Sequence, residues 1–161
     1  MLTEQNLKAA YKHFNQAFES QKNGDYSSAI QNYRISIINF PTIEAYLNLA
    51  SVLSKKGKFK EAINECYLAL RIDSTEYSAY NYIGYYLVKL KKYYEAKIWL
   101  DEALKFDDNV NKHLTYFNLG IIYEKRGDWY KAIEMFNKAL KIKPDFDKAT
   151  KNLILLSARL N

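Results

Sequence analysis

Small residues recur at a near-constant interval along this chain, in a background of apolar positions with helical periodicity. Four alanines are separated by 33, 34 and 36 residues, and each lies five residues after a turn position. A fixed period in this range indicates a stack of helical repeats and not a globe around one central core. The alanines are Ala29, Ala62, Ala96 and Ala132, and the turn positions are Gly24, Gly57, Lys91 and Gly127.

The last repeat shows most clearly how each unit should fold. Two sets of apolar and small residues follow a 3.6-residue period on either side of the pair Gly127-Asp128. The glycine suits a left-handed helix stop, and the aspartate suits the N-cap of the next helix. The pattern predicts two antiparallel helices that Gly120 and Ala132 allow to approach closely. The first helix carries Tyr116, Leu119, Gly120 and Tyr123 on one face, and the second carries Ala132, Phe136 and Ala139.

These positions resemble the tetratricopeptide repeat (TPR) family, which has a 34-residue period. The repeat at 113–146 matches all eight signature positions of the family, with Tyr116 where tryptophan is common. The repeats at 43–76 and 77–112 match seven each, with Ser74 and Asp108 in place of proline. The first repeat, 10–42, is weaker because polar side chains occupy three normally apolar positions. These are His13, Gln16 and Ser20.

The resemblance covers nearly the whole chain and implies its architecture. We expect an all-α fold, a right-handed α-solenoid of four TPR helix hairpins plus a C-terminal capping helix, in a single domain over residues 1–161. Residues 147–160 repeat the first-helix spacing once more, and such a lone amphipathic helix usually covers the last apolar face of a solenoid. The expected hairpins are 10–42, 43–76, 77–112 and 113–146.

Two departures from the repeat pattern predict local changes in structure. Lys91 replaces the turn glycine of the third repeat, and a left-handed backbone there costs about 1 kcal/mol. The segment Asp107–Lys112 adds two residues before the fourth repeat. We therefore expect the stacking angle to change at that junction.

Composition and charge limit the kinds of partner and the cellular compartment that we expect for this chain. Apolar residues make up 48% of the chain, which is enough for a sizeable core. The net charge of +6 suits acidic partners, although a solvated surface gives such a charge equally often. The single cysteine, Cys66, falls on a core position of its repeat and is expected to be a buried reduced thiol. No apolar run approaches the roughly 20 residues of a membrane helix, and no secretory leader is visible at the N-terminus. These features predict a cytoplasmic protein without membrane insertion.

In the TPR family the first helix of each repeat lines a concave groove, so the resemblance implies where partners bind. One position within the repeats forms a row of amides, which can donate to and accept from a peptide backbone. The alternative is that asparagine is simply common at this position in the family. The row comprises Asn15, Asn48, Asn118 and Asn152, with Tyr82 in the third repeat.

Two further rows fall on the same side of the predicted stack. Basic residues lie near the C-terminal end of every first-type helix, where they favour acidic peptides or, alternatively, only stabilise the helix dipole. This row comprises Lys22, Lys55, Lys89, Lys125 and Arg159. Apolar residues in the groove are expected to anchor a partner segment, unless they pack between hairpins. They are Phe14, Phe18, Leu47, Tyr85, Leu114, Phe117 and Ile121, which fall on groove-facing positions or close to them.

No residue pattern predicts catalysis, a cofactor or a metal site. His13 and His113 lie on separate repeats without ligands at metal spacing, and no Gly-rich phosphate loop occurs. The sequence therefore favours a non-catalytic adaptor that binds an extended or helical segment of a partner protein in its groove. The alternative is a self-assembling scaffold that oligomerises through its stack ends. Binding to nucleic acid is disfavoured because most tyrosines occupy signature positions and should be buried.

Overall fold

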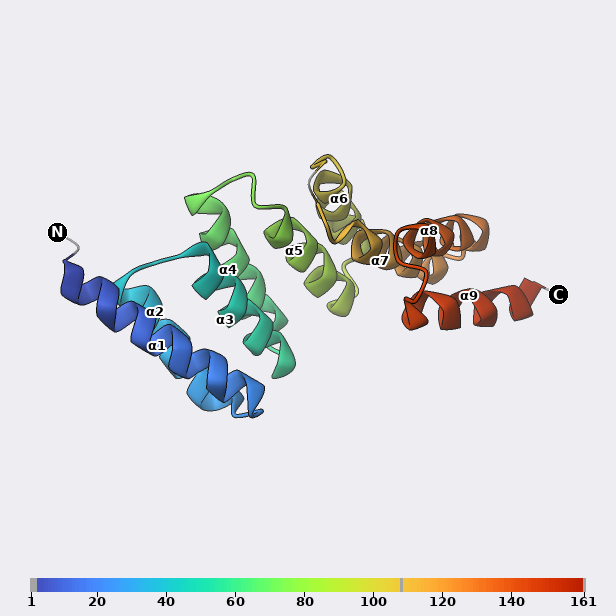
Figure 1. Ribbon diagram of the computed structural model, residues 1–161. Helices are drawn as coiled ribbons and strands as arrows, with labels where there is room; N and C mark the ends of the chain where they lie inside the picture. Colours follow the sequence, from blue (N-terminus) through green and yellow to red (C-terminus); the bar gives the residue numbers. More distant parts are fainter. Residues whose placement is uncertain (1–2, 108, 161) are drawn as a thin grey trace.

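The computed structural model describes residues 3–107 and 109–160, and this part of the chain forms nine α-helices and no strand (Figure 1). Eight of the helices pair into four antiparallel hairpins, and α9 follows alone. The helices are α1 (Glu4–Lys22), α2 (Tyr26–Asn39), α3 (Ile43–Lys55), α4 (Phe59–Ile72), α5 (Tyr77–Lys89), α6 (Tyr93–Ala103), α7 (Lys112–Lys125), α8 (Trp129–Ile142) and α9 (Asp147–Leu160).

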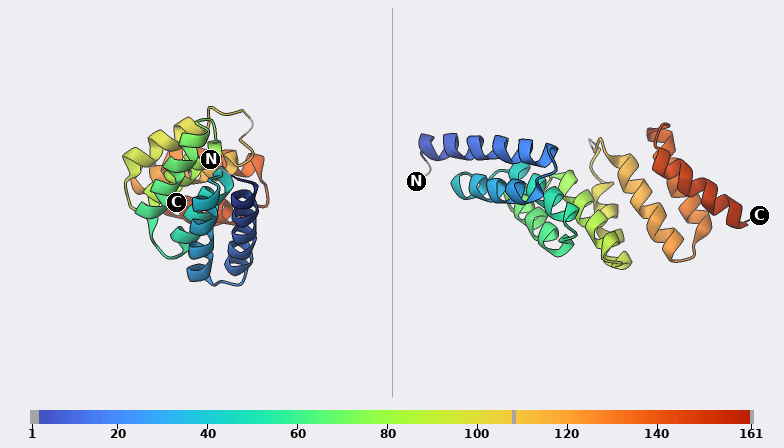
Figure 2. Two further views of the ribbon diagram at one scale, coloured as in Figure 1. Left: turned by 90° about the vertical axis from the view of Figure 1, so that its left-hand side faces the viewer. Right: turned by 90° about the horizontal axis from the view of Figure 1, so that it is seen from below.

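The hairpins stack side by side along one axis, so the molecule is elongated with its termini at opposite ends (Figures 1 and 2). Each hairpin contacts the next through its second helix, and the first helices also contact one another from α3 to α5 and from α5 to α7. This arrangement confirms the predicted right-handed α-solenoid with a capping helix.

The repeated small residues set the close approach of the helices. All four repeat alanines are fully buried. A Cβ added at Gly120 would lie 2.5 Å from the Phe136 ring, and one added at Gly84 would lie 2.5 Å from the Leu100 side chain. Since real side chains do not approach so closely, larger residues would force the two helices of a hairpin apart.

The hairpin turns use the left-handed backbone that the sequence predicted. Gly24, Gly57 and Gly127 have φ angles of 74–78°. Lys91 occupies the equivalent position with φ 60°, and among the described residues it is the one non-glycine with positive φ. Asp128 accepts a hydrogen bond from the Lys131 backbone as the N-cap of α8, as expected.

In the first hairpin His13 and Ser36 have polar partners, while Gln16 is exposed and Ser20 is partly buried. His13 Nδ1 lies 2.8 Å from Asn32 Oδ1 on α2, and the Ser36 hydroxyl donates to the Ala10 carbonyl at 2.8 Å. Phe14 packs edge-on against the buried Tyr33 ring, with centroids 5.5 Å apart. These contacts explain how a helix that departs from the signature still packs in register.

The core runs the length of the stack and ends at α9. Cys66 is a free thiol with no exposed surface, as predicted. Leu156 of α9 is buried against Ala132 and Phe136, which covers the last hairpin. Within the described part of the chain, no helix is long and apolar enough to cross a bilayer.

Candidate functional site: a recess between the third and fourth repeats

A buried polar network joins the third and fourth repeats. Asn109 lies in the lengthened connection between α6 and α7, and its side chain donates to the Ala103 carbonyl at 2.8 Å. The Asn81 amide of α5 donates to Asn109 Oδ1 at 3.3 Å, while Thr115 of α7 donates its hydroxyl hydrogen to Asn81 Oδ1. The three side chains are almost fully buried. The lengthened connection therefore supplies a buried polar side chain, Asn109, to the junction between the third and fourth repeats.

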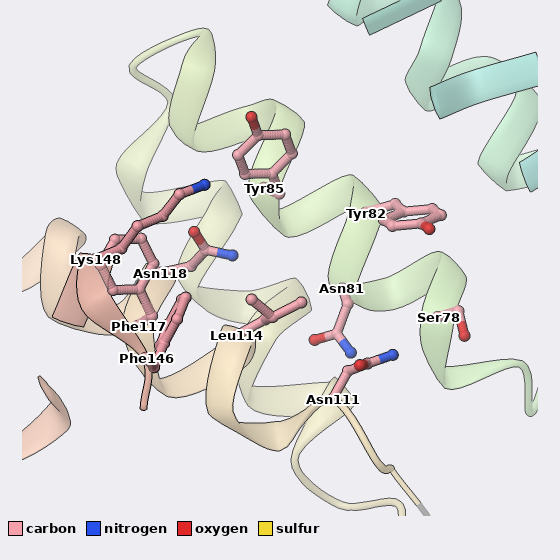
Figure 3. A pocket seen from close by; sticks show the side chains of 10 residues that line it. All are labelled: Ser78, Asn81, Tyr82, Tyr85, Asn111, Leu114, Phe117, Asn118, Phe146 and Lys148. Carbon is pink, nitrogen blue, oxygen red and sulfur yellow. The ribbon is translucent and has the colours of Figure 1, made fainter. Parts of the chain in front are cut away.

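Above this network lies a recess of about 230 Å³ between α5, α7 and the start of α9 (Figure 3). We call it the α5–α7 recess. Its walls come from the first helices of two adjacent repeats and from the capping helix, so it forms only when these elements stack. The lining residues are Ser78, Asn81, Tyr82, Tyr85, Asn111, Leu114, Phe117, Asn118, Phe146 and Lys148.

One wall of the recess is apolar and held in place by aromatic contacts. The Phe117 ring packs against Phe136 of α8 and against Phe146, with centroid distances of 5.8 and 5.1 Å. The His113 ring packs edge-on against Phe146 at 5.3 Å. Leu114 stays 37% exposed at the mouth of the recess. This wall presents a preformed apolar surface to any group that enters.

The remaining lining is polar. Asn118 is 8% exposed, and its amide points into the recess, as Figure 3 shows. It makes no side-chain hydrogen bond within the described ranges. The Tyr82 phenol can donate a hydrogen bond, and burial raises its pKa further above neutral pH. Lys148 reaches over the recess from α9, and Lys89 Nζ lies 5.3 Å from the centre of the Tyr85 ring.

Comparison with known proteins identifies the family. The tetratricopeptide repeat profile matches residues 43–76, 77–110 and 113–146. The chain belongs to the tetratricopeptide repeat family. TPR proteins generally mediate protein–protein interactions, and they are typically non-catalytic scaffolds.

Two of the curated relatives are much longer than this TPR chain. BBSome complex member BBS4 of Bos taurus is 32% identical over 105 residues, which are 65% of this chain and 20% of the relative. A TPR repeat-containing protein of Methanocaldococcus jannaschii is 30% identical over 149 residues, which are 84% of this chain and 25% of the relative. The chain thus spans about a fifth to a quarter of these two relatives.

Solved structures of other TPR proteins share the fold. PilF of Pseudomonas aeruginosa has a TM-score of 0.85 at 22% identity, covering 97% of this chain and 71% of its own. A MamA crystal structure has a TM-score of 0.78 at 25% identity, covering 92% and 81%. YrrB, described as a TPR protein with an unusual peptide-binding site, has a TM-score of 0.75 at 21% identity, covering 89% and 74%.

The structure brings four of the groove residues that the TPR resemblance implied into one place. Tyr82, Tyr85, Phe117 and Asn118 line the α5–α7 recess, and Lys89 lies beside it. Their gathering in one recess makes this junction the candidate site.

The other groove residues lie elsewhere along the stack. Leu47 is partly buried against the core, and Ile121 packs on the cluster beneath α9. The Asn48 amide donates to the Glu44 carbonyl in its own helix at 2.9 Å, which occupies one of its two donors. The asparagine row is therefore not uniform in hydrogen bonding. The remaining positions, Asn15, Asn152, Lys55 and Lys125, do not line the recess.

Several lining residues were absent from the groove rows of the sequence. Phe146 and Lys148 come from the entry to α9, and Asn111 comes from the lengthened connection. Asn81 lies one position before Tyr82 and serves the buried network. The added residues at 107–112 were the one signal in the sequence that this junction differs from the others.

The described residues contain no group of three His, Cys, Asp or Glu side chains placed to hold a metal ion. Burial, with Lys143 nearby, lowers the pKa of His113, and this ring packs against Phe146 and pairs with no nucleophile.

Proposed function

We propose that this TPR chain is an interaction module that binds a segment of a partner protein with one large apolar side chain seated in the α5–α7 recess. The observation that carries the proposal is the recess itself, with an apolar wall and an amide at Asn118 in one concavity. Buried apolar anchors with a few placed polar groups are typical of peptide recognition.

The size of the recess favours a side chain over a free small molecule. Its volume of about 230 Å³ is below the roughly 300–1,000 Å³ of most small-molecule clefts. One aromatic or long aliphatic side chain can rest on Phe117 and Phe146, and the Asn118 amide can then pair with the neighbouring peptide bond of the segment. Lys148 and Lys89 favour an acidic residue beside the anchor.

The experiment is a selection of random displayed peptides on the purified chain, repeated with two variants. Leu114→Glu places a charge at the mouth of the recess, while the matched control Leu155→Glu changes a 61% exposed leucine on α9. We expect enriched peptides that share one large apolar residue, bind the wild type and the control equally, and bind Leu114→Glu at least about tenfold more weakly. Enrichment that is equal on all three proteins would contradict the proposal.

A second candidate is assembly of copies through the stack ends, favoured by exposed apolar side chains at both ends. Tyr11 of α1 is 70% exposed, and Ile154 and Leu155 of α9 are 63% and 61% exposed. Burying such residues between copies would gain about 25 cal/mol per Å² of apolar surface. Sedimentation over a wide concentration range tests this candidate, and a monomer at high micromolar concentration would exclude it.

A further inference from the structure

Basic residues gather at three successive hairpin turns, on one edge of the solenoid. The seven-residue windows 55–61, 89–95 and 125–131 hold ten Lys and Arg against three Asp and Glu. All ten basic side chains are exposed. We call this surface the basic edge, and it comprises Lys55, Lys56, Lys58, Lys60, Lys89, Lys91, Lys92, Lys125, Arg126 and Lys131.

The three turns form one continuous surface. A shallow depression is lined by Lys58 and Lys60 from one turn and by Leu90 from the next. Another is lined by Lys91 and Lys92 together with Arg126 of the following turn. A single extended ligand could therefore contact all three turns.

Most of this charge is not neutralised within the molecule. Within the described ranges, ion pairs join three of the ten cations to acidic residues, namely Lys58 to Glu61, Lys92 to Glu95 and Lys131 to Asp128. The other seven make no ion pair there. Exposed cations that repel one another along an edge favour a ligand of opposite charge.

The backbone conformation of Lys91 is a second, independent observation that supports partner binding at the basic edge. The three other turns place glycine at this left-handed position, whereas Lys91 holds it with φ 60°. A side chain there costs about 1 kcal/mol. Backbone strain of this kind often accompanies function. Here the strained residue places a cation at the middle of the three turns.

We infer that the basic edge binds a glutamate- or aspartate-rich segment of a partner protein, at a surface that meets the α5–α7 recess only at Lys89. Each turn keeps one carboxylate of its own, at Glu61, Glu95 or Asp128, among its cations. A continuous phosphate backbone would meet all three carboxylates, whereas a flexible peptide can space its acidic residues between them.

The test measures fluorescence anisotropy of a labelled glutamate dodecamer with the full chain, and a glutamine dodecamer is the neutral control. The edge variant is Lys91→Gly with Arg126→Gln, and glycine at position 91 relieves strain, so folding is preserved. The matched control removes the same charge from the opposite edge with Lys141→Gln and Lys151→Gln, both of which change exposed residues. A third variant, Asn118→Ala, tests whether the acidic peptide binds in the α5–α7 recess instead of at the basic edge.

We expect the acidic peptide to bind, the neutral peptide not to bind, and added salt to weaken the complex. The edge variant should bind the acidic peptide roughly fivefold more weakly or worse, while the control and Asn118→Ala should stay within roughly twofold of wild type. Equal losses in the edge variant and the control, a loss with Asn118→Ala, or no binding would overturn the inference. So would tighter binding of oligothymidine or phosphatidylserine vesicles than of the acidic peptide.

Discussion

The Thr115 hydroxyl of α7 donates a hydrogen bond to the Asn81 side-chain oxygen of α5, which ties the first helices of the third and fourth repeats together. Thr115 has no exposed surface and Asn81 is 6% exposed. Through Asn81 and Asn109 this contact reaches the lengthened α6–α7 connection. The floor of the α5–α7 recess therefore depends on a polar network that apolar substitution would break.

Thr115→Val should destabilise the chain by about 1–3 kcal/mol, because it keeps the shape but leaves the buried Asn81 oxygen without its donor. Urea unfolding followed by circular dichroism measures the change. Thr150→Val is the matched control, since Thr150 is exposed on α9, and it should change stability by less than about 0.5 kcal/mol. Equal unfolding midpoints for Thr115→Val and wild type would show that the network contributes no stability.

Lys91→Gly should stabilise the fold by up to about 1 kcal/mol, because glycine adopts the φ of 60° without a Cβ clash. The reciprocal change Gly127→Lys should cost a similar amount at a φ of 77°, since nothing lies within 4 Å of a Cβ there and only backbone strain acts. Thermal and urea unfolding of both variants test the pair. Stability shifts in the same direction for both variants would show that backbone strain at this turn position is not the cause.

His113 should make the chain less stable in mild acid. Burial, with a smaller contribution from Lys143, lowers the pKa of this imidazole in the folded chain below its ordinary value of 6.5, against an opposing effect of Asp145. The unfolded state therefore binds the proton more readily, so stability is full above pH 6.5 and falls as the pH drops through that value and toward the folded pKa.

The measurement is urea stability at several pH values between neutral and mildly acidic for the wild type and for His113→Gln. Other titrating groups, such as Glu65, whose pKa is raised by burial, affect the stability of both proteins equally. The difference between the two pH profiles therefore reports on His113 alone. We expect the wild type to lose more stability than the variant on acidification. A parallel decline in both proteins would remove His113 as the cause.

Cys66 should resist thiol reagents in the native protein. Its side chain has no exposed surface, and burial raises its pKa well above the ordinary range, so almost no thiolate forms at neutral pH. Reaction with an aromatic disulfide reagent should be very slow in buffer and rapid in denaturant. Fast native labelling would mean that the second repeat opens readily.

The repeat positions were predictable because each is fixed by contacts inside one hairpin. The small residues that close each helix pair, such as Ala132, and the turn glycines follow from a local period, and the structure places them as the pattern required. The TPR resemblance, and not the local period, predicted that Tyr82 and Asn118 lie on the groove side of their helices. This prediction covered residues of α5 and α7 that line the α5–α7 recess, but not the residues at the start of α9 that close it.

The rest depends on how the repeats stack. Phe146 and Lys148 reach the recess only because α9 packs across α7, and Asn109 is buried only because the connection folds back toward α5. The pattern of apolar and polar residues within a single helix does not show how that helix packs across its neighbours. The hydrogen-bond partner of His13 on α1 could not be predicted for the same reason. It is Asn32, which lies nineteen residues away on α2.

The most direct test of the account is a backbone amide NMR titration of the chain with the tightest peptide from the displayed library. If the segment seats in the α5–α7 recess, the largest shift changes will cluster at Tyr82, Tyr85, Leu114 and Asn118, and the α1–α2 hairpin will stay unchanged. Shift changes that cluster at another part of the stack, with these four amides unmoved, would contradict the central claim.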